Sequence, residues 1–68
     1  MDAEKINQAA QDLLAACFEA DDPVKQLYAE LENLRASGDW SELELRRIQE
    51  LTLSSAKAIA DNVHIHLG

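Results

Sequence analysis

The sequence predicts an all-α protein, a small helical bundle that forms a single domain over residues 1–68. Apolar residues recur three or four positions apart through most of the chain, which is the spacing of one face of a helix. No segment alternates apolar and polar residues as a half-buried strand does. The single proline and the internal glycine fall between the periodic stretches, where helices would begin and end.

The first helix is predicted over residues 3–20, with Asp2 as its N-cap. Its apolar positions are Ile6, Ala10, Leu13, Leu14, Cys17 and Phe18. Proline inside a helix costs about 3 kcal/mol, whereas Pro23 costs little as the first residue of a new helix capped by Asp22. We therefore predict a break or kink at Pro23 and a second helix over residues 23–36. The apolar register runs unbroken past the proline, which favours a kinked continuation with both segments presenting the same side. The buried stripe of the second helix is expected to comprise Val24, Leu27, Tyr28, Leu31 and Leu34.

A third and longer helix is predicted over residues 41–67. Ser41 and Glu44 have the spacing of a capping box, Trp40 and Leu45 have that of a hydrophobic staple, and Asp39 is an alternative cap. The short connection around Gly38 requires this helix to fold back antiparallel, so that 23–36 and 41–67 form a helical hairpin. The longer helix overhangs its partner, and the first helix of the same chain or of another chain can cover that overhang.

The third helix carries two apolar faces. The broad face comprises Leu45, Ile48, Thr52, Ala56, Ile59, Ala60, Val63 and Leu67, and the narrow stripe comprises Leu51, Ala58 and Ile65, extended by Trp40 and Leu43. Two faces require two neighbours within the chain, or one neighbour and a second chain. A chain this short buries only about 60% of its unfolded surface and is marginally stable alone. Because the one cysteine rules out an internal disulfide, we expect a homodimer or a heterodimer with a protein partner.

The net charge of −7 argues against binding to nucleic acid or to an anionic membrane surface, since both need basic residues. No apolar run approaches the roughly 20 residues of a membrane span, and no export signal begins the chain, so we expect a cytoplasmic protein. The acidic residues Glu19, Asp21 and Asp22 form either a docking site for a basic partner or a solvated turn that contains a cap.

We expect no enzyme, cofactor or metal site. Cys17 lies on the apolar stripe beside acidic residues that would raise its pKa, so it is interpreted as a buried structural thiol. His64 and His66 lie two apart and point to opposite sides of a helix, so capping of the helix end is preferred to metal binding. Trp40 and Tyr28 are either interface anchors or, respectively, a staple and an edge of the core.

The turn at Gly38-Asp39 and the run Leu53-Ser54-Ser55-Ala56-Lys57-Ala58-Ile59 resemble the small co-chaperones of type III secretion needle subunits, which are antiparallel helical hairpins. The resemblance covers residues 31–65, about half of the chain, and the capped segment before Pro23 departs from it. It implies a heterodimer with a larger helical-repeat chaperone.

Together these observations predict a small acidic protein–protein interaction module, such as an adaptor, an inhibitor or a co-chaperone of bacterial type. Its expected interface comprises Tyr28, Trp40, Leu43, Leu51, Ala58 and Ile65. An alternative hypothesis is an anionic decoy, whose carboxylates occupy a nucleic-acid-binding site on another protein.

Overall fold

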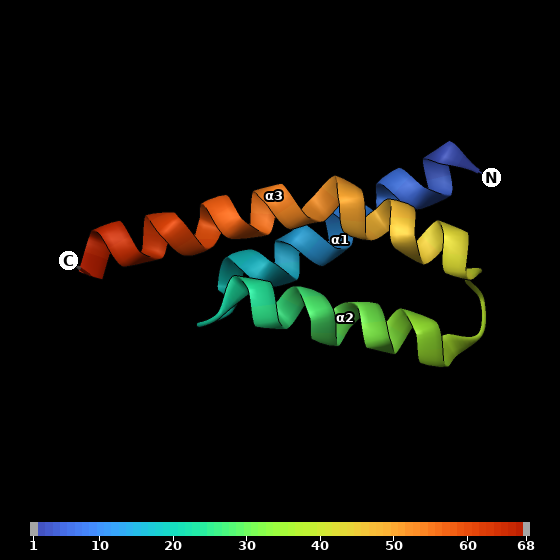
Figure 1. Ribbon diagram of the computed structural model, residues 1–68, viewed down its shortest axis with the longest axis horizontal. Helices are drawn as coiled ribbons and strands as arrows, with labels where there is room; N and C mark the ends of the chain where they lie inside the picture. The colour runs from blue at the N-terminus through green and yellow to red at the C-terminus, as the bar shows by residue number, and fades with distance from the viewer. Residues whose placement is uncertain (1, 68) are drawn as a thin grey trace.

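The computed structural model describes the backbone of residues 2–67 and the side chains of residues 2–62. It contains three helices: α1 spans Ala3–Glu19, α2 spans Pro23–Ser37 and α3 spans Glu42–Leu67. Each helix packs against both of the others, and α2 runs antiparallel to α1 and α3 (Figure 1). The prediction of an all-α bundle is confirmed for the described residues, none of which lies in a strand.

The predicted N-caps of the first two helices are present. The Asp2 carboxylate accepts hydrogen bonds from the backbone N–H groups of Glu4 and Lys5 at 3.0 and 3.2 Å. The Asp22 carboxylate accepts from the N–H of Lys25 at 3.2 Å, and Pro23 occupies the first turn of α2. Each cap satisfies N–H groups that have no partner within the helix, which is why these aspartates determine where the helices begin.

The chain breaks before Pro23, which is one of the two predicted forms, and then turns back instead of continuing as a kinked helix. Ala20 and Asp22 have extended backbone angles, and α2 then packs alongside α1 in the opposite direction (Figure 1). The apolar register is unbroken across the proline because both helices face the same core. Two antiparallel helices that share one core therefore show the same unbroken apolar register as a single kinked helix.

The turn between α2 and α3 follows the prediction closely. Gly38 has a φ of 78°, the left-handed conformation that closes a helix without the penalty of a Cβ. Ser41 and Glu44 form the predicted capping box: the N–H of Ser41 donates to the Glu44 carboxylate at 2.9 Å, and the N–H of Glu44 donates to the Ser41 hydroxyl at 3.2 Å. Ser41 rather than Asp39 therefore caps α3.

The core lies where the three helices meet. Its fully or nearly buried members are Ile6, Ala10, Leu13 and Cys17 from α1, Leu27 and Leu31 from α2, and Leu45, Ile48, Thr52, Ala56 and Ile59 from α3. The predicted broad face of α3 is thus buried as far as Ile59, while Ala60 is half-buried and the side chains of Val63 and Leu67 lie outside the described residues. Phe18, one of the apolar positions predicted for the first helix, is 72% exposed.

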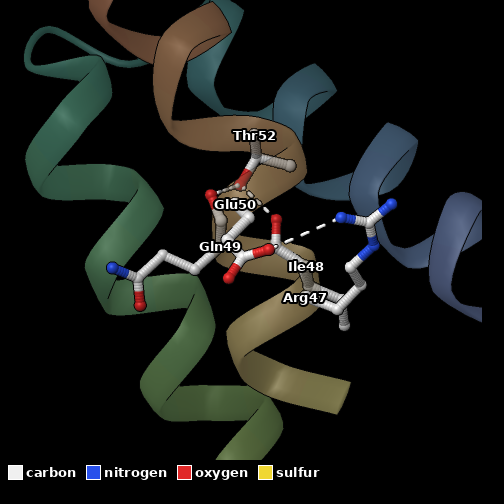
Figure 2. Close-up of polar contacts among 5 residues, drawn as sticks. All are labelled: Arg47, Ile48, Gln49, Glu50 and Thr52. Carbon is white, nitrogen blue, oxygen red and sulfur yellow. Dashed lines mark hydrogen bonds and ion pairs between the residues drawn. The ribbon is translucent and has the colours of Figure 1, made fainter. Parts of the chain in front are cut away.

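Thr52 is the one polar residue among the buried side chains of residues 2–62. Its hydroxyl donates back to the carbonyl of Ile48 at 2.7 Å and lies 3.3 Å from that of Gln49 (Figure 2). Both carbonyls belong to α3 itself, so the hydroxyl is satisfied without a partner on α1 or α2. The surfaces that join the three helices are consequently apolar.

The C-terminal part of α3 extends beyond the ends of the other two helices (Figure 1). The overhang predicted for the long helix is therefore present, but α1 does not cover it. α1 instead packs along the body of the bundle against both α2 and α3.

Candidate interaction surfaces

The narrow stripe of α3 is left open by the bundle. Leu43 is 60% exposed, Leu51 is 38% exposed and Ala58 is exposed, while the side chain of Ile65 lies outside the described residues. α3 has two neighbours within the chain, as one form of the prediction required; they bury its broad face, and α1 also borders the stripe at Leu51. The stripe therefore remains an apolar strip on the outside of a helix whose other side is already buried.

Trp40 lies apart from this stripe. Its ring is half-buried, packs against the core, and lies beneath the Lys5 ammonium, whose nitrogen is 4.2 Å from the ring centroid. The same ammonium donates to the carbonyl of Asp39 at 3.2 Å. Because a cation over an indole face is attracted by the ring quadrupole, Lys5 fastens the start of α1 to the α2–α3 turn.

The predicted interface residues thus occupy separate surfaces. Trp40 lines a groove between α1 and α2, whereas Leu51 lines a depression of about 340 Å³ between α1 and α3. Tyr28 is 46% exposed on α2. The fold therefore does not present these side chains on a single flat interface.

The acidic residues Glu19, Asp21 and Asp22 are exposed around the α1–α2 connection. They line a shallow hollow with Lys25, and Asp22 is engaged as the N-cap of α2. Both parts of the sequence interpretation are therefore compatible with their position: a solvated turn that contains a cap, and an acidic surface open to a basic partner.

Cys17 is fully buried in the core. Burial raises the pKa of its thiol above the ordinary value, and the negative charge of Glu30 adds to the effect. The neighbouring carboxylate responsible is therefore Glu30, from the adjacent helix, and not one of the sequence neighbours named above. A thiol kept in its protonated form is a poor nucleophile, which fits a packing role.

No group of three or more metal-binding side chains converges within the described part of the chain. His64 and His66 fall outside the described side chains. Among the described residues, no helix is both long enough and apolar enough to cross a bilayer.

Sequence reasoning missed the groove between α1 and α2, which has a volume of about 370 Å³ and a mainly apolar lining. Its lining residues are Lys5, Gln8, Ala9, Asp12, Leu13, Glu30, Leu34 and Trp40. The sequence does hold a signal for its rim, since Gln8–Asp12 and Gln26–Glu30 have the four-residue spacing of side-chain pairs on a helix. Those pairs form, with hydrogen bonds of 3.1 and 2.8 Å from amide to carboxylate.

Comparison of the chain with protein-family models, with curated proteins and with solved structures finds no match.

Proposed function

We propose that this protein is a non-enzymatic interaction module that binds another protein chain through the narrow stripe of α3. One observation carries the proposal: Leu43, Leu51 and Ala58 are exposed on a helix that already packs against two others. Single exposed apolar residues are common on protein surfaces, but these three lie on the same side of one helix, eight and seven residues apart, with the exposed Arg47 between the first two. Such a face is suited to receive a helix of a partner.

The residues around the stripe suit a close approach. Ser54 and Ser55 are exposed next to it and have small side chains, as does Ala58. Small residues allow two helix axes to approach toward the short end of the usual range of roughly 8–10 Å. Complete burial of a leucine contributes about 1.5–3 kcal/mol, so the half-open leucines of the stripe can each supply only part of that. A stable complex would also need the rest of a surface of roughly 800 Å² per partner.

Photocrosslinking in the native host tests this proposal whether the partner is a second copy of the chain or a different protein. A benzophenone amino acid is placed at position 43 or 51 in the stripe, and at position 15 or 36 as controls, where exposed alanines lie elsewhere on the bundle. We expect discrete protein adducts from the stripe positions and few from the controls. Equal adduct yields at all four positions would refute the proposal.

A matched pair of variants tests the energetic side. Ala58→Glu places a charge in the stripe, and Ala15→Glu places the same charge on an exposed alanine of α1. If the partner is a second copy, sedimentation should show the dimer weakened by about tenfold or more for Ala58→Glu only, because burying an unpaired carboxylate is costly. Circular dichroism should show the same helical content for both variants as for the parent protein.

The anionic decoy is supported less well by the surface. The 13 acidic residues occur on all three helices and on both connecting segments. A nucleic-acid mimic needs its carboxylates along one face, with binding that falls steeply as salt is added. The heterodimer implied by the resemblance to needle co-chaperones is one form of the proposal above, with a helical-repeat chaperone as the partner of α3.

A further inference from the structure

The groove between α1 and α2 has the composition of a binding site for an apolar anchor. Ala9 and Leu13 from α1, Leu34 from α2, and Trp40 from the following turn supply its apolar lining. Leu13 is almost fully buried, while Ala9, Leu34 and Trp40 are half-buried and pack against the core. The groove is thus an opening onto the core, of about 370 Å³, on a different seam of the bundle from the stripe of α3.

The charges at its rim are unbalanced. Asp12 stands on the α1 side and Glu30 on the α2 side, and each accepts a hydrogen bond from a neutral glutamine of its own helix. Within residues 2–62, neither carboxylate takes part in an ion pair. The one cation at the groove, Lys5, lies over the Trp40 ring and donates to the Asp39 carbonyl. Glu30 is moreover only half exposed, so its charge is less well screened than that of a fully solvated residue.

We propose that this groove binds a basic amphipathic helix of a protein partner, with an apolar side chain seated against Trp40 and Leu34 and basic side chains paired with Asp12 and Glu30. The argument for this occupant is charge complementarity. The apolar lining calls for an aliphatic or aromatic anchor, and the two carboxylates on opposite rims call for a cation on each side of it. A helix lying between two antiparallel helices supplies this pattern, because residues three and four apart share one face.

This inference concerns a surface other than the stripe of α3 and stands apart from the function proposed above. Both can hold for one molecule, since the groove lies on the α1–α2 seam and the stripe beside the α1–α3 seam. The experiment below reports which of the two surfaces a basic helix uses.

The probe is a synthetic helical peptide of about 14 residues, roughly 21 Å long, with leucines on one face flanked by lysines. A scrambled peptide of identical composition, which cannot form an apolar face, is the matched control. Trp40 is the only tryptophan of the chain, so its fluorescence reports directly on the groove. We expect the amphipathic peptide to shift its emission to shorter wavelength in a saturable way, as the indole loses contact with water, and the scrambled peptide to leave it unchanged.

Two double variants with equal loss of charge give the decisive comparison. Asp12→Asn with Glu30→Gln neutralises the rim, whereas Asp61→Asn with Glu32→Gln neutralises exposed carboxylates elsewhere. We expect the dissociation constant to rise about fivefold to tenfold for the rim variant and less than about twofold for the control, since each exposed pair contributes modestly. Asp12, Glu32 and Asp61 are exposed and Glu30 is half-buried, and each replacement keeps the size of the side chain, so both variants should fold, as circular dichroism will verify.

The location of the peptide is read from amide chemical shifts. Changes centred on Ala9, Leu34 and the Trp40 indole support the proposal. Changes centred on Leu51 and Ala58 overturn it and leave the function proposed for α3 intact. Equal weakening by the two double variants, equal binding of the scrambled peptide, or absence of saturable binding would each overturn it as well.

Discussion

Replacement of Thr52 by valine should stabilise this protein, although it removes a buried hydrogen bond. The Thr52 hydroxyl is fully buried and donates only to carbonyls of its own helix (Figure 2). Those carbonyls also accept the regular backbone N–H bonds of α3, so they keep a partner when the hydroxyl is lost. Valine has the same branched shape and a similar helix propensity, so the helix itself should be unaffected.

The magnitude follows from two opposing effects. An ordinary hydrogen bond contributes about 0.5–1.5 kcal/mol net of desolvation, and the low end applies here because both carbonyls keep their backbone partners. The methyl group that replaces the hydroxyl contributes about 0.8 kcal/mol. We therefore expect a small net gain of about 0.3 kcal/mol, against a total stability of roughly 3–10 kcal/mol for a domain of this length.

Urea denaturation followed by circular dichroism measures the change, and thermal unfolding should show a rise in Tm of about 1–3 °C. Both are run at two protein concentrations, because any self-association would make the apparent stability depend on concentration. Thr52→Ala is the control and should be less stable, since it also removes the buried methyl group. A clear loss of stability in Thr52→Val would refute the reasoning and indicate that the hydroxyl bonds to another helix.

Three further predictions concern the caps and the buried thiol. Gly38→Ala should lower stability by about 1 kcal/mol because of the positive φ, with no steric clash since no atom lies within 4 Å of the added Cβ. The pKa of Glu44 lies below its ordinary value, chiefly because its carboxylate accepts from the N–H of Ser41. The stabilisation that ionised Glu44 gives to the folded state is therefore fully present above the ordinary glutamate pKa. It is lost as the pH falls through the lowered pKa of Glu44 in the folded protein, so Glu44→Gln should flatten the acid side of a Tm–pH profile. Cys17, buried and with a raised pKa, should react with a thiol reagent only as fast as the protein unfolds, as measured by labelling in increasing urea.

Each of these has a contrary outcome. An unchanged Tm for Gly38→Ala would show that the turn relaxes to a negative φ. If the Tm–pH profile of Glu44→Gln is parallel to that of the parent protein, ionisation of Glu44 does not stabilise the folded state. Labelling of Cys17 in the absence of urea, at the rate of a free thiol peptide, would show that the core opens at that point without global unfolding.

The local structure could be predicted from the sequence because short-range chemistry decides it. Asp2, Asp22 and Ser41 cap the helices as expected, and Gly38 takes the left-handed conformation. The helix bounds differ from the predicted ones by a single residue at three points. The periodicity of α3 also identified which of its faces would be buried, including Thr52.

The arrangement of the helices could not be predicted in the same way. The three-residue break before Pro23 reverses the chain, yet the apolar register alone is equally consistent with a kink. The contact between Lys5 and Trp40 joins residues 35 positions apart and has no periodic signature. Phe18 is next to the buried Cys17 in the sequence, and only the positions of α2 and α3 decide that one side chain is buried and the other exposed. Without the placement of α1 against α2, the groove lined by Trp40 could not be inferred.

The polar contacts between different parts of the bundle are gathered at one end. Lys5 reaches the α2–α3 turn, and Arg35 pairs with Glu42 across that turn at 3.3 Å. At the opposite end, where the chain passes from α1 to α2 and α3 projects outward, the side chains of residues 2–62 make no hydrogen bond or ion pair from one helix to another. The connection between α1 and α2 is therefore held against the rest of the bundle by apolar packing alone, and we expect its amides to exchange with solvent sooner than those beside the fully buried Leu27, Ile48 and Thr52.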